Sequence, residues 1–324
     1  MKAVIVREHG GPEVLEYSEQ LLPETGPGHI RVRLKAIGIN RRDSFIRAGI
    51  YKRTLPLIPG VEGAGIVDEV GAGVTGWAVG DRVAYYVPDI LGAYAEYQAV
   101  PAQKVVKLPA DISFEDAAAI FDHGLTAHYL STSTFPLRHG HRVLVHAAAG
   151  GVGSLLTQMA KRAGATVYGT VSTPEKAQLI KRLGADEAIL YRHTDFVEAI
   201  KTLTNGQGVN VVYDSVGKDT VQGSIRCLTR RGTLVLYGQS SGPVTAINPS
   251  ELADAGSLFF TRPHLAHYTA TQDELNQRSQ DIFSWYLRGE ISLNVDKTYR
   301  LSEAVEAHHR LGDRSNAGKL LLIP

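Results

Sequence analysis

The sequence predicts an α/β protein with a β-rich part and a doubly wound parallel sheet. Up to Ser113, short β-type runs are separated by glycine turns. From Arg142 to Thr261, strand-like and helix-like segments alternate. After Pro263 this alternation stops, and helices and a closing strand follow. These observations predict two domains, with the last residues returning to the β-rich one.

The β-rich part begins with strands that have a half-buried pattern. Segment 29–40, HIRVRLKAIGIN, alternates apolar and basic side chains with a period of two. Segment 59–87 contains short Val, Ile and Tyr runs, with glycine turns at 71–73 and 80–81. Short strands at such close spacing predict a small barrel or sandwich.

A helix over residues 113–132 opens the α/β part, with Ser113 as its N-cap and Asp116 three residues later. Helices are also predicted at Glu175–Leu183, Thr220–Thr229, 273–291 and 302–311. The predicted parallel strands are Arg142–His146, Thr166–Thr170, Glu187–Leu190, Val209–Tyr213, Thr233–Tyr237 and Ser257–Thr261. The closing strand is 319–324.

Composition excludes several classes of protein. The chain has 324 residues, 44% hydrophobic and 21% charged, as expected of a globular protein. A net charge of +1 creates no field that would attract nucleic acid or an anionic membrane. No apolar run approaches the roughly 18 residues of a membrane span, and the N-terminus lacks the features of a signal peptide. The single cysteine, Cys227, permits no internal disulfide, which fits a cytoplasmic location.

A glycine-rich turn follows the first strand of the alternating part. Segment 147–153, AAAGGVG, matches the dinucleotide-binding fingerprint, with Ala148 in place of the first glycine. Gly150 and Gly151 let the backbone approach a pyrophosphate, and Gly153 lets the helix pack closely on the strand. The alternative is a tight turn without a ligand. The position of segment 147–153 at the start of a six-strand alternation favours the nucleotide-binding interpretation.

The end of the second strand indicates which nucleotide binds. An NAD site usually has Asp or Glu there, whereas Thr170, Val171 and Ser172 are neutral and Lys176 follows within one helical turn. Ser172 and Lys176 would bind a 2′-phosphate, which predicts NADPH rather than NADH. The alternative is that Lys176 is a solvated helix residue. Glu175 is explained by its place at a helix N-terminus.

Several motifs resemble the medium-chain dehydrogenase/reductase superfamily. The similarity is strongest to its zinc-independent branch, the NADPH:quinone oxidoreductases related to zeta-crystallin. The motifs extend over nearly the whole chain and are GPGHIRVRLKAIGIN, PLIPGVEGAGIVDEVGAGV, GDRVAY, HAAAGGVG, VVYDSVG, YGQSSGPV, GSLFFTRPHL and GKLLLIP.

The resemblance implies a GroES-like β-barrel catalytic domain over 1–122 and 265–324 and a Rossmann NADPH-binding domain over 123–264. It implies a site in the cleft between them and a homodimer formed through the edge strand at GSLFF. Carried over by motif, the NADPH contacts would be Asn40, Arg41, Arg42, Asp43, Ser44, Phe45, Tyr129, Gly150, Gly151, Val152, Ser172, Lys176, Tyr191, Gly238, Gln239, Ser240, Ser241, Pro263, His264, Leu265 and Arg314.

The sequence departs from the related quinone reductases at two places. Phe45 stands where a tyrosine is expected, which excludes a phenol role at this position. Asp122 and His123 replace an apolar residue and a lysine, and the sequence suggests no role for them.

Zinc-dependent relatives carry a Gly-His-Glu motif, a catalytic cysteine and a four-cysteine lobe. Here Val61 occupies the position of the zinc-binding histidine, and Cys227 is the only cysteine. Glu62 remains, and we expect it to hold a barrel strand or an arginine by an ion pair. No ligand partners lie near the close histidine pairs, His264 with His267 and His308 with His309. We therefore expect no metal site.

Without a metal, a Gly-x-Ser-x-Gly nucleophile or a flavin motif, direct hydride transfer from NADPH is the expected chemistry. The candidate catalytic residues are Asn40, Phe45 and Tyr51, and Tyr129 and Arg262 are further lining candidates. The Tyr51 hydroxyl could hydrogen-bond a quinone oxygen. Alternatively, Tyr51 is a surface residue of a glycine-containing loop, and Arg262 serves a phosphate.

The sequence thus predicts an NADPH-dependent quinone reductase that acts on a small-molecule quinone without metal or flavin. The first alternative is an enzyme of the same fold that reduces the C=C bond of enones or enals, since a quinone is itself a conjugated enone. A second alternative, of another class, is an NADPH-binding structural or RNA-binding protein. The near-neutral charge and the lack of a basic-aromatic cluster argue against RNA binding.

Overall fold

The computed structural model describes residues 1–312 and 317–324. Its contacts divide the chain into two units. Unit 1 comprises Met1–His123, Thr269–Leu287 and Leu293–Pro324, and unit 2 comprises Gly124–Tyr268 and Arg288–Ser292. The sequence placed the boundaries at residues 122/123 and 264/265. The catalytic and nucleotide-binding roles of the two parts remain predictions.

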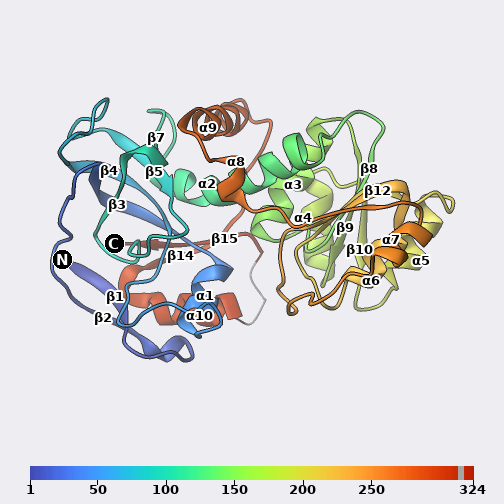
Figure 1. Cartoon of the computed structure of the whole chain (residues 1–324), viewed down its shortest axis with the longest axis horizontal. Helices are drawn as coiled ribbons and strands as arrows, with labels where there is room; N and C mark the ends of the chain where they lie inside the picture. The colour runs from blue at the N-terminus through green and yellow to red at the C-terminus, as the bar shows by residue number, and fades with distance from the viewer. Residues whose placement is uncertain (313–316) are drawn as a thin grey trace. The chain divides into compact units, whose positions relative to one another are not determined.

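A seven-stranded sheet organises unit 1, with strand order β14-β15-β3-β4-β5-β7 and β6 paired to β3 (Figure 1). The strands β1 and β2 form a separate antiparallel pair. The bounds are β1 Lys2–Val6, β2 Leu15–Glu19, β3 His29–Ile39, β4 Glu62–Val70, β5 Arg82–Tyr86, β6 Tyr97–Pro101, β7 Val105–Lys107, β14 Val295–Arg300 and β15 Lys319–Ile323.

The longest strand of unit 1, β3, has the predicted alternation. Ile30, Val32 and Leu34 are buried in the core of the unit, whereas the basic residues between them are more exposed. Strand β15 pairs antiparallel with β3 so that Leu321 lies opposite Gly38. The last strand of the chain therefore completes a sheet that begins near the N-terminus, as the sequence predicted.

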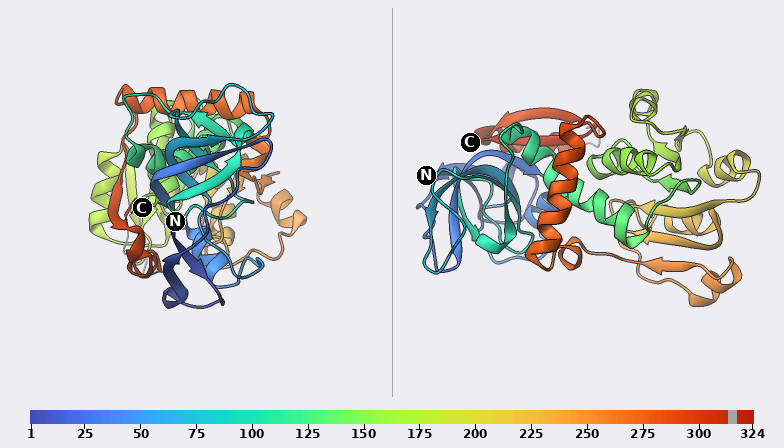
Figure 2. Two further views of the ribbon diagram at one scale, coloured as in Figure 1. Left: turned by 90° about the vertical axis from the view of Figure 1, so that its left-hand side faces the viewer. Right: turned by 90° about the horizontal axis from the view of Figure 1, so that it is seen from above.

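The helices of unit 1 are α1 (Arg41–Arg47), α9 (Gln272–Leu287), α10 (Ala304–Gly312) and the one-turn helices η1 (Pro12–Val14), η2 (Ala102–Lys104) and η4 (Leu301–Glu303). Helix α9 packs against β7 and η2 (Figures 1 and 2). Helix α2 (Phe114–Tyr129) contains the boundary between the two units. The predicted N-cap is confirmed, because the Asp116 N–H donates to Ser113 Oγ at 3.0 Å.

Unit 2 contains a six-stranded parallel sheet, as predicted, with strand order β10-β9-β8-β11-β12-β13 (Figure 1). Helices α3 and α4 lie on one side of this sheet and α5, α6 and α7 on the other (Figure 1). The strands are β8 Arg142–Val145, β9 Thr166–Val171, β10 Glu187–Leu190, β11 Val209–Asp214, β12 Leu228–Leu236 and β13 Phe259–Thr261. The helices are η3 Leu130–Thr134, α3 Gly151–Arg162, α4 Pro174–Arg182, α5 Phe196–Leu203, α6 Val221–Arg226, α7 Pro249–Asp254 and α8 Leu265–Tyr268.

Two predicted boundaries in unit 2 are wrong by three residues or more. Helix α6 ends at Arg226 rather than at Thr229, and β12 begins at Leu228 rather than at Thr233. The reason is that Leu228 pairs with Val209 across a register shift, which extends β12 backwards and buries the Leu228 side chain. Tertiary pairing here overrides the helical pattern of the local sequence.

The strand order places a topological switch point between β8 and β11. From β8 the chain adds β9 and then β10 on one side, and it returns to add β11, β12 and β13 on the other. Loops that leave the carboxyl ends of β8 and β11 therefore diverge, which is where ligands bind in sheets of this kind.

We predict that Gly153→Ala destabilises the protein. A Cβ at this position would overlap the carbonyl oxygen of Ala147 and lie 2.9 Å from Cα of Ala148, both of them backbone atoms. Relief of this overlap should lower the free energy of unfolding by about 1–3 kcal/mol, measured by urea denaturation. Gly26→Ala is the control, since a Cβ there meets nothing within 4 Å. Equal stability of the two variants would contradict the prediction.

Candidate functional site

The glycine turn after β8 leads directly into α3. Gly150 is the N-cap of this helix, and the first backbone hydrogen bond of the helix runs from the Ser154 N–H to the Gly150 carbonyl at 2.9 Å. The N–H groups of Gly151, Val152 and Gly153 therefore have no partner within the helix. Together with the positive end of the helix dipole, they can bind a phosphate group.

A buried polar network holds this turn in place. The His146 ring lies 3.0 Å from Thr170 Oγ1 and 3.1 Å from Ser224 Oγ, and Ser224 Oγ donates to Asp214 Oδ2 at 2.8 Å. Ala147 adopts a left-handed backbone conformation with φ of 51°. These contacts connect β8, β9 and β11 beneath the turn, so that the turn is supported from three strands.

Ser172 and Lys176 both lie at the carboxyl end of β9, as the sequence predicted for a 2′-phosphate site. Ser172 follows directly after β9, and Thr173 caps α4 by accepting the Lys176 N–H at 3.3 Å. Both Ser172 and Lys176 are partly exposed. Tyr191 follows β10, is 49% exposed, and donates its N–H to Val171 O at 3.2 Å.

The loops after β12 and β13 carry further predicted contacts. The segment Gly238–Ser241 follows β12 and packs on the loop after β11, with the Ser240 N–H donating to Ser215 O at 3.1 Å. Arg262 follows β13 and donates to Leu236 O at 3.1 Å, with Pro263 and His264 after it. Because the strands are parallel, their carboxyl ends share one edge, and this edge gathers the predicted residues of unit 2.

Tyr129 and Leu265 lie in helices of unit 2 rather than in the loops at this edge. Tyr129 is the last residue of α2 and is buried, with its ring stacked on Tyr268 at a centroid distance of 4.3 Å. Leu265 is the first residue of α8 and is also buried.

Asn40 lies in a buried ionic cluster in unit 1. Glu62 and Lys319 form an ion pair of 2.6 Å with side chains that are 0% and 2% exposed. Lys319 Nζ also donates to Asn40 Oδ1 at 2.8 Å, and Asn40 Nδ2 donates to Glu62 Oε2 at 3.0 Å. The amide of Asn40 is thus fixed at both ends. The expected ion pair of Glu62 is present, and its partner is a lysine.

A second buried chain of hydrogen bonds begins beside Asn40. Asp43 Oδ2 accepts the Asn40 N–H at 2.9 Å and the Tyr94 hydroxyl at 3.1 Å. Tyr94 also contacts His308 Nε2 at 3.0 Å, and Arg47 Nη1 lies 2.8 Å from His308 Nδ1. Since arginine only donates, His308 Nδ1 accepts and its proton lies on Nε2, which donates to Tyr94.

Burial and charge set the protonation states in this chain. Burial is the main cause that raises the pKa of Asp43 to about 6, and the Glu62 charge adds to it. Burial and the Arg47 charge lower the pKa of His308 to about 3, which keeps this ring neutral. Asp43 is completely buried, and its expected contact with the cofactor stays a prediction.

The rest of the predicted segment forms helix α1 and the loop after it. Ser44 Oγ donates to Arg41 O at 2.7 Å, and Arg42 Nη2 donates to Pro88 O at 2.8 Å. The rings of Phe45 and Tyr51 meet edge to face at 5.4 Å, so Tyr51 packs on an aromatic neighbour rather than projecting freely. The last predicted contact, Arg314, lies outside the described residues.

Sequence reasoning missed Lys319 and His308 as parts of the predicted site. Both contact residues more than 250 positions away, Lys319 with Glu62 and His308 with Arg47. The one local signal is a lysine that begins the otherwise apolar segment KLLLIP, together with the single acid in GVEGAG. Glu62 and Lys319 each begin a strand whose next residues are uncharged and mostly buried, and a buried charge needs a partner of opposite sign.

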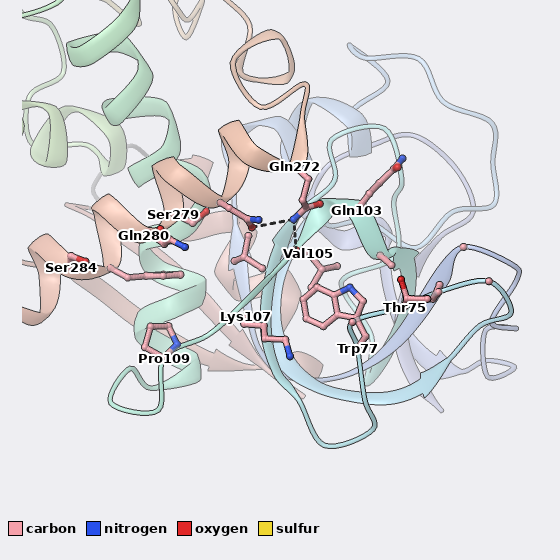
Figure 3. A pocket seen from close by; sticks show the side chains of 18 of the residues that line it. Thr75, Trp77, Gln103, Val105, Lys107, Pro109, Gln272, Ser279, Gln280 and Ser284 are labelled. Carbon is pink, nitrogen blue, oxygen red and sulfur yellow. Dashed lines mark hydrogen bonds between the residues drawn. The ribbon is translucent and has the colours of Figure 1, made fainter.

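A groove of about 780 Å³ in unit 1 lies between α9 and the β7 region, beside Trp77 and Lys107 (Figure 3). None of the predicted site residues lines it.

Within 1–312 and 317–324, no group of three or more His, Cys, Asp or Glu residues could hold a metal ion. Val61 is fully buried and offers no ligand atom.

In the described part of the chain, no helix combines the length and the apolar character that crossing a bilayer requires.

Comparison with known proteins covers both units. Residues 26–110 match the family described as alcohol dehydrogenase GroES-like domain, and residues 151–280 match the family described as zinc-binding dehydrogenase. A quinone oxidoreductase of Pseudomonas aeruginosa is 45% identical over 324 residues, which cover 100% of this chain and 99% of the relative. A 2-haloacrylate reductase of Burkholderia sp is 41% identical, covering 99% and 98%. The crystal structure of Escherichia coli quinone oxidoreductase complexed with NADPH matches with a TM-score of 0.97 and 45% identity over 100% of both chains.

We predict a pH-dependent stability difference between the wild-type protein and Asp43→Asn. Because the pKa of Asp43 rises from 3.8 to about 6 on folding, the folded state binds this proton more tightly. The resulting stabilisation is complete below pH 4 and is lost as the pH rises through 6. Relative to the variant, the wild type should lose about 2.4 kcal/mol between pH 4 and 7.5, measured by urea denaturation at several pH values. A difference in the free energy of unfolding that does not change with pH would contradict the prediction.

Proposed function

We propose that this chain, which belongs to the quinone oxidoreductase family of zinc-independent medium-chain dehydrogenases/reductases, is an NADPH-dependent quinone reductase. Its GroES-like part and its Rossmann part are the domains of that family. The observation that carries the proposal is the carboxyl edge of the unit 2 sheet, where a glycine turn and the pair Ser172 and Lys176 lie at adjacent strand ends.

The residues at this edge fit NADPH. The free N–H groups at the start of α3 suit the pyrophosphate, and Gly150 leaves room for close backbone approach. At the end of β9, Ser172 supplies a hydroxyl and Lys176 a positive charge, with no acid in the place where NAD sites have one. A 2′-phosphate is thus bound rather than repelled. Gly238–Ser241 and Pro263 are proposed to line the same nucleotide.

When bound, NADPH supplies a hydride to the acceptor. The side chains of this protein then have to bind and orient the acceptor and stabilise the charge that it gains. Asn40 is suited to orientation, because Lys319 and Glu62 hold its amide while one amide hydrogen stays available. We propose that the Tyr51 hydroxyl donates to a quinone oxygen.

A quinone suits these groups better than a simple ketone does. Hydride addition to a ketone puts a full charge on one oxygen, which requires strong polarisation. A quinone spreads the charge over its ring and its second oxygen, so neutral donors such as an amide and a phenol are sufficient.

Reduction of an activated C=C bond is the second candidate function. The 2-haloacrylate reductase from Burkholderia is 41% identical over 99% of this chain. An acrylate and a quinone both accept hydride at a carbon conjugated with a carbonyl. We therefore propose weaker activity on enones in the same site.

We also propose a homodimer that forms through β13. This strand is at the edge of the unit 2 sheet, and Phe259 on it is 62% exposed. Its outer backbone groups are available for pairing with a second copy across a twofold axis. The cytoplasmic location expected from the single cysteine, Cys227, stays a prediction.

The cofactor assignment predicts that Lys176→Glu weakens NADPH binding by tenfold or more, which corresponds to at least about 1.4 kcal/mol. NADH binding should change little, because NADH lacks the 2′-phosphate. Fluorescence titration with both nucleotides measures the two affinities. Arg182→Glu, at the exposed end of the same helix, is the matched charge reversal and should leave both unchanged. Equal losses for NADPH and NADH would mean that Lys176 acts through the fold.

The substrate assignment predicts turnover of quinones with NADPH, weak activity on enones and almost none on secondary alcohols or simple ketones. Steady-state kinetics on p-benzoquinone, a larger naphthoquinone, an enone, a ketone and an alcohol test this order. Tyr51→Phe should lower quinone turnover modestly, since one hydrogen bond is lost. If the enone or the alcohol outperforms every quinone, the proposed function is wrong.

A further inference from the structure

Asp122 and His123 interrupt a run of buried residues in α2 of unit 1, next to the Asn40 cluster. Both are partly exposed, whereas the preceding residues from Ala117 to Phe121 are buried. The Asp122 N–H donates to Glu62 Oε1 at 2.7 Å. Its carboxyl group makes no hydrogen bond to any residue in the described ranges. A carboxyl group with open hydrogen-bonding capacity therefore lies at the edge of a buried ionic cluster.

We propose that the carboxyl group of Asp122 delivers the proton that completes quinone reduction. This inference rests on the proposed function and names a further catalytic residue for it. Glu62 connects the two ends of the arrangement, because its Oε2 holds the Asn40 amide and its Oε1 holds the backbone of Asp122. The proton donor thus lies in the same cluster as the amide proposed to orient the acceptor.

The reaction requires one proton in addition to the hydride. Hydride transfer brings two electrons and one hydrogen to the quinone and leaves NADP⁺ and a hydroquinone monoanion. The O–H bond of the Asp122 carboxyl then breaks as a new O–H bond forms on the anionic oxygen. The products are neutral hydroquinone and the Asp122 carboxylate, which regains a proton from solvent through its exposed side. The sum is quinone, NADPH and H⁺ giving hydroquinone and NADP⁺.

The surroundings of Asp122 keep its proton available near neutral pH. Burial is the first cause that raises its pKa to about 7, and the negative charges of Glu62 and Asp43 add to this effect. The positive charges of Lys319 and Arg42 oppose it. Two further titratable groups lie nearby, Tyr86, whose pKa is raised well above its ordinary value, and His123. An acid with a pKa near the working pH is the most effective proton donor.

Two other titratable groups near Asp122 do not serve as well. Asp43 is completely buried and already bonds Asn40 and Tyr94. Burial and the Lys319 charge lower the pKa of His123 well below its ordinary value, so that its ring is neutral and holds no proton of suitable acidity. His123 remains able to donate a hydrogen bond as a neutral imidazole.

The decisive variant is Asp122→Asn, which keeps the backbone bond to Glu62 and removes only the acid. We expect kcat for p-benzoquinone at pH 7 to fall at least tenfold, while the Kd for NADPH stays within twofold. Wild-type kcat should decline as the pH rises through 7, because the acid form is lost, and the variant should lack this decline. Asp122→Glu should restore part of the rate. Glu115→Gln, an exposed residue on the same helix, is the matched control and should behave as wild type.

A second readout needs neither quinone nor NADPH. Carbon-13 NMR of the aspartate carboxyl groups should show one that titrates near pH 7, and this signal should be missing from Asp122→Asn. If the wild type reduces quinones and Asp122→Asn keeps kcat within twofold with the same pH profile, this inference is wrong and the proposed function is not affected. The absence of an aspartate carboxyl signal that titrates near pH 7 and is missing from Asp122→Asn overturns this inference too. A wild-type protein that reduces no quinone overturns the proposed function, and this inference with it.

Discussion

The buried ion pair between Glu62 and Lys319 connects the strands of unit 1 that come from opposite ends of the chain. Glu62 begins β4, Lys319 begins β15, and Asn40, which bonds both, follows β3. Removing two charges from water costs several kcal/mol per ion, and only close geometry with additional hydrogen bonds offsets it. Here the lysine has two acceptors and the glutamate three donors. Loss of either partner would leave an uncompensated charge in the core, so the positions of the three strands depend on this pair.

Two glycines, one in each unit, leave space for a neighbouring side chain. A Cβ on Gly38 would overlap the Glu62 carboxylate, so the glycine in β3 makes room for the ion pair. In unit 2, a Cβ on Gly169 would come within 2.8 Å of the Ala148 methyl group, so a glycine in β9 accommodates the alanine that replaces the first glycine of the fingerprint. The departure from that fingerprint at Ala148 is thus compensated on the neighbouring strand.

Much of the fold follows from local patterns, whereas the site depends on distant contacts. The alternation in β3 and the six strand-like segments of unit 2 predict their elements, because period and burial coincide there. The start of β12 was missed, because pairing of Leu228 with Val209 is a tertiary effect. The glycine turn is visible from sequence, since backbone freedom is a property of the residues themselves. The contact between Lys319 and Glu62 is not, because a single sequence carries no information on which of many charged residues meet across 257 positions.

Strand β15 is the last strand to be translated, although it pairs with β3 near the start of the chain. Every strand of unit 2 lies within one continuous stretch of the chain, so its sheet can form as soon as that stretch has left the ribosome. The edge of β3 from Ile37 to Ile39 pairs with β15, which is translated only after the whole of unit 2. Throughout that interval the nascent chain carries an unpaired, apolar strand edge, the kind of surface that joins with other chains. Molecular chaperones that cover this edge would therefore have most effect on the yield of folded protein during translation.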